Sequence, residues 1–368
     1  MILDLKEAEC LKLLGLCRYI PVFLGKRYAG QVLYTDTTKH LLLLGLIKYT
    51  ADGKCLKLTY FGNSVLRELG YTFSTDARSL NNGSRYIRRM LCAEINMLFH
   101  SAGIDIFSEK IKDLNRSEPC YIPFLNMRSA KNGAALSCAR FAGIFRNGDT
   151  AYIAYYAVDD EIGVHVSFEE GAFKPLAFSL EGVEYIKIIF AGNSLDALWK
   201  LLFSKKSKEK CKNQSEHFSQ AFQKFAYNVH LFERNKNGTM QAQIIAVPDY
   251  RKKLAEYFCV GKTKLPPILG NCDGFHNGRP LIIAIDMELN RICKGIKQAN
   301  KYSELEPYIL CLNFQESFLF KYFQHMGIRK AQILPIGFEK VETGLNLKLK
   351  QFASEPARDT KGDYMVIK

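Results

Sequence analysis

The chain has 368 residues, of which 48% are hydrophobic, 12% aromatic and 24% charged, and its formal net charge is +14. This composition excludes wholesale disorder, and the length predicts two or three domains. The apolar runs are too short for a membrane-spanning helix and the first residues lack a signal-peptide pattern, so we expect a soluble, cytoplasmic protein without membrane insertion. Its 11 cysteines have neither zinc nor disulfide spacing and indicate buried, reduced thiols. The positive charge favours nucleic acid as a partner.

Residues 1–75 show the pattern of a winged helix-turn-helix domain. The run Thr35-Asp36-Thr37 offers N-cap residue types in front of a helical apolar repeat, and Gly45 is a typical helix stop. An Asp-Gly pair at 52–53 between two β-prone runs predicts a hairpin, which would be the wing. The predicted elements are helices over 6–16, 20–28 and 35–44, hairpin strands over 46–49 and 55–58, and a closing helix over 61–69.

The helix over 35–44 is the expected recognition helix. In the major groove of double-stranded DNA it would present Lys39 and His40 among its exposed residues. On the hairpin, Lys48, Lys54 and Lys57 are expected to reach backbone phosphate, and so to affect affinity more than sequence choice. The alternative is a small helical domain that binds protein instead of DNA.

A linker is expected over 72–84, followed by a long helix over 84–102. Arg85, Arg88 and Arg89 cluster at the start of this helix, where they can clamp a phosphate backbone. The alternative is a solvated helix edge.

The rest of the chain alternates strands and helices, which predicts a mixed fold of the α+β or α/β class. We expect one region over 84–203 with a β-hairpin at Asn147-Gly148, a second α/β region over 213–352, and a loose tail over 353–368 with a short edge strand from Met365. The predicted strands are 121–125, 140–146, 150–158, 183–191, 241–248, 281–287, 308–314 and 331–336. The predicted helices are 194–203, 250–258, 290–302 and 316–326.

Acidic residues offer the one candidate catalytic centre, since Walker A, GxSxG and HExxH motifs are absent. Asp286 and Glu288 end an apolar strand, and strand alternation puts them on the same face. With Asp273 from a preceding turn, they form a candidate site for Mg²⁺ or Mn²⁺, which can activate water at a scissile phosphate. Lys294 and Lys297 follow on the next helix as candidate positive partners. The alternative is that the two acids cap a helix start and face solvent.

This set resembles the active site of the PD-(D/E)XK restriction-endonuclease-like superfamily, in which a turn Asp, an acidic pair at a strand end and a Lys share one metal ion. The chain departs from that motif at Cys272, where the motif has Pro, and at Asn290, where it has Lys. The catalytic lysine would therefore have to come from the following helix, as Lys297.

The whole chain also resembles the replication-relaxation proteins of plasmids and integrative elements in Gram-positive bacteria. Besides the predicted winged helix, three short motifs carry this resemblance: ARFAGI at 139–144, AYYA at 154–157 and ILCLNFQ at 309–315. The resemblance implies a winged-helix DNA-binding end and a restriction-endonuclease-like fold in the C-terminal part. It also relates the chain to C-type mobilisation relaxases, which nick DNA at a transfer origin.

Two main functions stay open at the level of sequence. The first is a DNA-processing protein of a mobile element, in which Asp273, Asp286 and Glu288 hold Mg²⁺ or Mn²⁺ for strand nicking, with relaxosome or replication proteins as further partners. The second is a non-catalytic DNA-binding accessory protein or regulator with a degenerate nuclease-like domain. A protein-interaction adaptor that never meets DNA is a third hypothesis.

Overall fold

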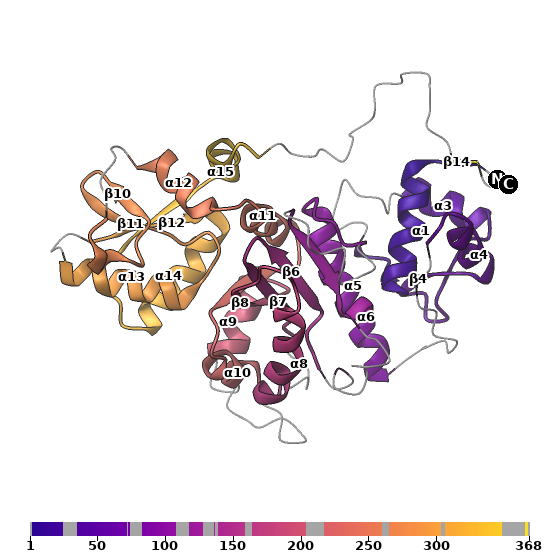
Figure 1. The fold of residues 1–368 in the computed structure, drawn as a ribbon, viewed down its shortest axis with the longest axis horizontal. Coiled ribbons are helices and arrows are strands. Elements are labelled where there is room, and N and C mark those ends of the chain that lie inside the picture. The colour runs from indigo at the N-terminus through magenta and orange to yellow at the C-terminus, as the bar shows by residue number, and fades with distance from the viewer. Residues whose placement is uncertain are drawn as a thin grey trace. The chain divides into compact units, whose positions relative to one another are not determined.

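The structure is a computed structural model that describes residues 2–24, 35–71, 73, 83–107, 118–127, 136, 139–158, 164–203, 217–259, 265–302, 306–347 and 365–366. The chain mixes helices and strands, as predicted, and divides into two compact units (Figure 1). The first unit is Met1–Glu109 with Leu349–Lys368, and the second is Lys110–Lys348. Among the described residues, no helix has both the length and the apolar character needed to cross a membrane.

The first unit combines short strands with four helices of the described ranges. The sheet has the order β2-β4-β3, and both of its strand pairs are antiparallel. The elements are α1 (Leu5–Cys17), β2 (Ile20–Pro21), α3 (Thr35–Leu43), β3 (Ile47–Tyr49), β4 (Cys55–Leu58), α4 (Tyr60–Glu68) and α5 (Gly83–Ser101). The predicted helix over 20–28 lies outside the described residues from 25 on, and its first two residues form β2 instead.

The local signals for the hairpin and its neighbours are confirmed. Gly53, at the predicted turn between β3 and β4, has a φ of +69°, a conformation that glycine adopts without steric cost. The Thr59 hydroxyl accepts a hydrogen bond from the N–H of Gly62 and so caps α4, as predicted. Gly45, which follows α3, also has a φ of +69°.

Helix α5 belongs to the first unit, whereas the sequence grouped it with the region up to residue 203. The reason is its buried face: Tyr86 of α5 packs in one apolar cluster with Tyr19 and Cys55. The short edge strand expected near Met365 is present as β14 (Met365–Val366), which pairs antiparallel with β1 (Ile2–Leu3).

The second unit contains a five-stranded sheet of order β5-β6-β7-β8-β9. β5, β6 and β7 form an antiparallel meander around the Asn147-Gly148 turn, and β7, β8 and β9 are parallel. The strands are β5 (Cys120–Pro123), β6 (Gly143–Asn147), β7 (Thr150–Tyr156), β8 (Tyr185–Gly192) and β9 (Val229–Glu233). The helices of this part are α6 (Phe124–Met127), α8 (Val166–Phe178), α9 (Leu195–Phe203) and α10 (Phe218–Lys224).

A second sheet in the same unit has the order β10-β11-β12-β13. β11, β12 and β13 are parallel, and helices α13 and α14 connect them. The elements are α11 (Lys236–Ile245), α12 (Tyr250–Phe258), η4 (Pro267–Leu269), β10 (Gly274–His276), β11 (Arg279–Ile283), α13 (Leu289–Tyr302), β12 (Tyr308–Leu312), η5 (Asn313–Gln315), α14 (Glu316–His325), β13 (Gln332–Ile336) and α15 (Phe338–Leu345).

Both sheets share one core, which differs from the two separate regions expected over 84–203 and 213–352. Apolar side chains of the first sheet, such as Ile153 and Phe190, belong to the same buried cluster as Ile282 and Ile309 of the second. In addition, β9 follows the predicted boundary in sequence but completes the first sheet.

The predicted strand over 241–248 is wrong, because this segment lies in helix α11 and the turn after it. The alternation Gln-Ala-Gln-Ile resembles a strand, but the Asn235 side chain caps a helix by accepting from the N–H groups of Asn237 and Gly238. Thr239, Gln241, Ala242 and Ile245 are buried at helical spacing.

Candidate functional site

Asp286 and Glu288 lie in a turn between β11 and α13, whereas the sequence placed them on the strand. β11 ends at Ile283, and Met287 has a φ of +53°, which is rare for a residue with a side chain. The predicted alternation therefore does not apply, yet the turn still brings both carboxylates together. They do not face solvent, as the alternative reading expected, since Asp286 is 0% and Glu288 2% exposed.

Two buried glutamines hold this turn in place. The side-chain amide of Gln315 donates to the carbonyl of Ile285 at 2.7 Å, and that of Gln241 reaches the same oxygen at 3.5 Å. Gln241 also donates to the carbonyl of Leu231 in β9. The turn is thereby tied to both sheets of the unit.

The Asp286 carboxylate accepts hydrogen bonds on both oxygens. Oδ2 accepts from the hydroxyl of Tyr250 and from Nη2 of Arg251, and from Nε of Arg251 at 2.8 Å. Oδ1 accepts from the backbone N–H of Glu288 at 3.2 Å. Both side-chain donors come from the first turn of α12, so this carboxylate anchors the start of that helix.

The Glu288 carboxylate is equally enclosed. Its Oε1 accepts from the side-chain amide of Asn228 at 2.5 Å. Its Oε2 accepts from the amino group of Lys187 at 3.3 Å and from Nη2 of Arg251. The Arg251 guanidinium therefore joins the two acidic side chains.

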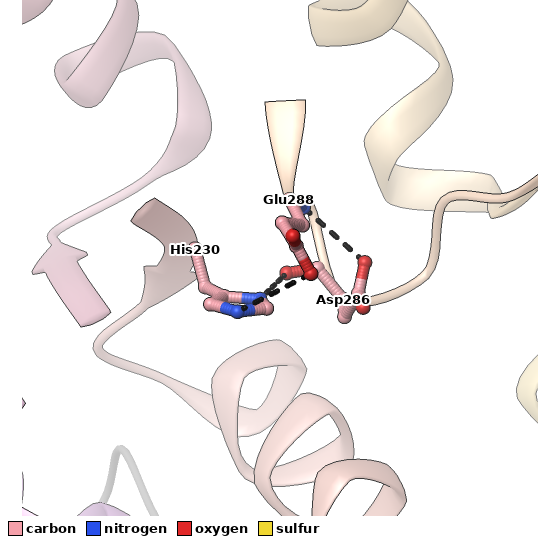
Figure 2. Close-up of side chains that lie close together, drawn as sticks. All are labelled: His230, Asp286 and Glu288. Carbon is pink, nitrogen blue, oxygen red and sulfur yellow. Dashed lines mark hydrogen bonds and ion pairs between the residues drawn. The ribbon is translucent and has the colours of Figure 1, made fainter. Parts of the chain in front are cut away.

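His230 of β9 completes the group, and the sequence reading missed it. Its Nδ1 lies 2.9 Å from the carbonyl oxygen of Asp286 and its Nε2 lies 3.7 Å from Oε2 of Glu288 (Figure 2). His230 and Glu288 also form an isolated antiparallel bridge. The sequence signal was a lone histidine in an apolar run at 229–232, which by itself is more typical of a core residue.

These groups lie on one face of the five-stranded sheet. Tyr152 of β7 and Lys187 of β8 are register partners, and the Tyr152 ring contacts the ring of His230. A cavity of about 1440 Å³ opens here, and Tyr152, Lys187, Tyr250 and Arg251 are among its lining residues. Asp286 and Glu288 do not line it. The cavity therefore exposes the partners of Asp286 and Glu288 but not these two carboxylates, whereas Asp273 is among its lining residues.

Asp273, the third acid of the predicted metal site, does not join Asp286 and Glu288. It pairs with Arg291 at 2.9 Å, and its Oδ2 also accepts from the backbone N–H of Ile283 at 2.7 Å. Lys294 and Lys297 are exposed on α13, and neither forms an ion pair with these acids in the part of the chain that the structure describes. The structure thus replaces Asp273 by His230 as the neighbour of the acidic pair, and Lys297 by Arg251 and Lys187 as its positive partners.

The charges of this site follow from its burial and its ion pairs. Burial raises the pKa of the Asp286 and Glu288 carboxyl groups, but neighbouring basic groups outweigh this effect, first Arg251 at Asp286 and His230 with Arg251 at Glu288, so both pKa values lie below the ordinary range. Burial lowers the pKa of His230 to about 4, so its imidazole is neutral at neutral pH. Burial raises the pKa of the Tyr250 hydroxyl, which therefore stays protonated and donates to Asp286.

We call the buried ion pairs of this site the carboxylate cluster. It contains three acids and three cations: Asp273, Asp286, Glu288, Lys187, Arg251 and Arg291. A divalent ion would add two charges to a buried group that is already balanced, and it would find each oxygen of Asp286 and Glu288 bound to a protein donor. The residues present therefore do not fit the expected Mg²⁺ or Mn²⁺ site.

The basic residues predicted on the recognition helix both lie at the surface. In α3, the side chains of Lys39 and His40 are 68% and 52% exposed. His40 is partly engaged, because its Nδ1 is hydrogen-bonded to the carboxylate of Glu7 in α1. Lys39 lies 4.0 Å from the exposed Asp36 one turn earlier.

The hairpin lysines occupy one ribbon. Lys48 and Lys54 are exposed, and Lys57 is half-buried. Lys48 of β3 and Lys57 of β4 are direct register partners, so their side chains leave the same face of the hairpin. The three predicted lysines are therefore gathered in one short segment.

The start of α5 adjoins this hairpin. The hydroxyl of Tyr86 lies 3.2 Å from both carboxylate oxygens of Asp52 at the hairpin turn. Arg85, next to Tyr86, is exposed, and Arg88 and Arg89 are half-buried. The predicted arginines thus begin a helix that contacts the tip of the hairpin.

No protein-family model, no curated protein and no solved structure matches the chain. A functional assignment therefore depends on the geometry of the two units.

Proposed function

We propose that the protein binds double-stranded DNA and that its first unit does so as a winged helix. The proposal is supported by the order of α1, β2, α3, β3, β4 and α4 and by the sheet order β2-β4-β3. In this reading α3 is the recognition helix in the major groove and the β3–β4 hairpin is the wing.

The observation that carries the proposal is the pairing of Lys48 with Lys57 across the hairpin. Directly opposite residues of an antiparallel pair leave the same face of the ribbon, so the two lysines place two positive groups side by side on that face. A phosphate backbone on that face would gain two contacts. Lys54 at the turn and Arg85 at the start of α5 would extend the same basic surface.

The second unit favours the non-catalytic form of this function. Arg251, Lys187 and Arg291 neutralise the carboxylates that were expected to hold a metal ion. We therefore propose a DNA-binding accessory protein or regulator in place of a nicking enzyme. The further proposal that this protein acts in the replication or mobilisation of a mobile element is based only on the sequence resemblance.

Salt dependence of DNA affinity tests the binding function. For the full chain with a mixed-sequence duplex, we expect log affinity to fall steeply with log salt, with a slope that drops by about 1 for each of Lys48→Ala and Lys57→Ala. Lys297→Ala, an exposed lysine of the second unit, is the matched control and should leave the slope unchanged. An affinity that does not depend on salt, or that is absent, contradicts the proposal.

Nicking of supercoiled plasmid tests the non-catalytic part. The purified wild type is expected to leave plasmid intact in Mg²⁺ and in Mn²⁺, with and without the element's own origin sequence. If the wild type nicks the plasmid, and Asp286→Asn loses this activity but keeps its DNA affinity, the protein is a metal-dependent nuclease and the non-catalytic proposal is wrong.

A further inference from the structure

Arg251 occupies the position of a cation between two buried carboxylates. Its Nη2 contacts Oδ2 of Asp286 and Oε2 of Glu288, and its Nε donates to Asp286 at 2.8 Å. One positive group thus bridges two acidic side chains, which is the role that a divalent ion has in a carboxylate site.

His230 is oriented as a metal ligand toward the same place. A carbonyl oxygen only accepts, so Nδ1 of His230 carries the proton that is donated to Asp286, and Nε2 carries a lone pair. This Nε2 is fully buried, has no hydrogen-bond partner within the described ranges, and lies 3.7 Å from Oε2 of Glu288. Histidines that bind metals usually donate their other ring N–H in this manner.

The three side chains could converge on one ion. One ligand atom from each of His230, Asp286 and Glu288 lies within 4.8 Å of the others. Figure 2 shows the imidazole edge directed at the Glu288 carboxylate. One imidazole nitrogen with two carboxylates is a donor set suited to first-row transition ions such as Mn²⁺ and Zn²⁺.

We infer that His230, Asp286 and Glu288 form a transition-metal site that Arg251 closes, with its guanidinium in the place of the ion. While Arg251 is present, the charges of the carboxylate cluster balance and its oxygens are occupied. Removal of Arg251 leaves three acids against two cations and takes the guanidinium away from Oδ2 of Asp286 and Oε2 of Glu288, with Nε2 of His230 still open. An ion would then displace only the neutral donor Tyr250 at Asp286 and the mobile amino group of Lys187 at Glu288. This inference concerns the second unit and is independent of DNA binding by the first.

Mn²⁺ binding to the full chain tests the inference, measured by the loss of the free-ion EPR signal. Arg251→Ala should bind Mn²⁺ at least about tenfold more tightly than the wild type, and Arg251→Ala with Glu288→Gln should lose that gain. The matched control is Lys252→Ala, because Lys252 is the next residue of α12, is exposed and lines the same cavity. It should behave like the wild type.

Thermal unfolding covers the case in which Arg251→Ala is unstable. Arg251→Met keeps the aliphatic part of the side chain, and it too should bind Mn²⁺ more tightly than the wild type. If Arg251→Ala or Arg251→Met is unfolded in EDTA, addition of Mn²⁺ should restore its folding. The wild type should unfold at the same temperature in EDTA and in Mn²⁺. Absence of binding or of rescue in both variants overturns the inference. So does a Mn²⁺-dependent rise in the unfolding temperature of the wild type that Asp286→Asn removes.

Discussion

The hydroxyl of Tyr86 in α5 lies 3.2 Å from both carboxylate oxygens of Asp52 at the tip of the β3–β4 hairpin. Tyr86 is 3% exposed, and its hydroxyl also lies within hydrogen-bonding distance of Thr50. Asp52 in turn accepts a hydrogen bond from the Thr50 hydroxyl at 2.6 Å. This hydrogen bond is the main reason why the pKa of the Asp52 carboxyl group is lowered. Helix α5 is therefore positioned to hold the shape of the proposed wing.

Replacement of Tyr86 by Phe tests this link. The variant loses one hydroxyl without a change of packing, so we expect a loss of about 1 kcal/mol in the free energy of unfolding of the first unit. DNA affinity should fall a few-fold while its salt slope stays unchanged, because no phosphate contact is removed. Tyr60→Phe, at a tyrosine that is 88% exposed, is the control. Equal effects of the two substitutions would show that the Tyr86 contact has no role in the wing.

Helix α3 presents four side chains on one face, at the spacing of one helical stripe. Asp36, Lys39, His40 and Leu43 follow at i, i+3, i+4 and i+7, and Leu43 is 86% exposed. In the major groove, Lys suits guanine, Asp suits the amino group of cytosine, and an apolar side chain suits the methyl group of thymine. We therefore expect Leu43 to contribute to base choice and the hairpin lysines to contribute to affinity.

The expected contact between Leu43 and a thymine methyl group can be tested in a DNA duplex that the wild type selects from a random-sequence library. In the wild type, replacing the contacted thymine by uracil, which lacks the methyl group, should weaken binding about fivefold, a cost of roughly 1 kcal/mol. In Leu43→Ala the same replacement should have no effect. A thymine-to-uracil penalty of the same size in both proteins would remove Leu43 from the readout, and selection of no preferred sequence would remove α3 as a whole.

His230 makes the stability of the second unit depend on pH. Its pKa is lowered to about 4 in the fold, chiefly by burial, from 6.5. Below the unfolded value the unfolded chain takes up a proton that the folded chain does not, so stability is intact above 6.5 and falls as the pH drops toward 4. The loss between about pH 7 and about pH 5 should be about 2 kcal/mol.

Urea unfolding at a series of pH values measures this loss. His230→Asn can still donate to the Asp286 carbonyl but does not titrate, so the difference between wild type and variant isolates this histidine from the other six. We expect the variant to show a flatter pH profile over the same range. Parallel profiles for the two proteins would mean that His230 is protonated within the fold.

The sequence predicted those elements whose signals are local. The Asp52-Gly53 pair fixes the hairpin turn, and Thr59 caps α4 through its own hydroxyl, so both were found from neighbouring residues alone. The acidic pair was identified for the wrong reason, because the chain leaves the strand at Ile283 and turns at Met287. The spacing of apolar and acidic residues gives no indication of that turn.

The partners of the acidic pair could not be predicted, because they come from distant strands and helices. His230 is 58 residues from Glu288 by number and reaches it only because β9 joins a sheet that begins before residue 150. In the sequence, Lys252 and Lys253 directly follow Arg251 within the predicted helix over 250–258, and nothing in that helix distinguishes Arg251 from them. Only the packing of α12 against the turn pairs the half-buried Arg251 with two buried carboxylates and leaves Lys252 exposed.

Arg291 provides a final test of whether the carboxylate cluster stabilises the second unit. Its guanidinium, with 9% of the side chain exposed, pairs with Asp273 at 2.9 Å and also donates to the carbonyl of Ile283. Arg291→Met leaves Asp273, whose side chain is only 11% exposed, without its cation, so we expect a loss of about 3 kcal/mol in the free energy of unfolding. Adding Asp273→Asn should recover part of that loss, because the uncompensated charge is removed. Lys297→Met, at an exposed position of the same helix, should change stability by no more than about 0.5 kcal/mol. If the Arg291 variant is as stable as the Lys297 variant, the ion pairs of this cluster do not hold the fold together, and their retention would have to serve a ligand instead.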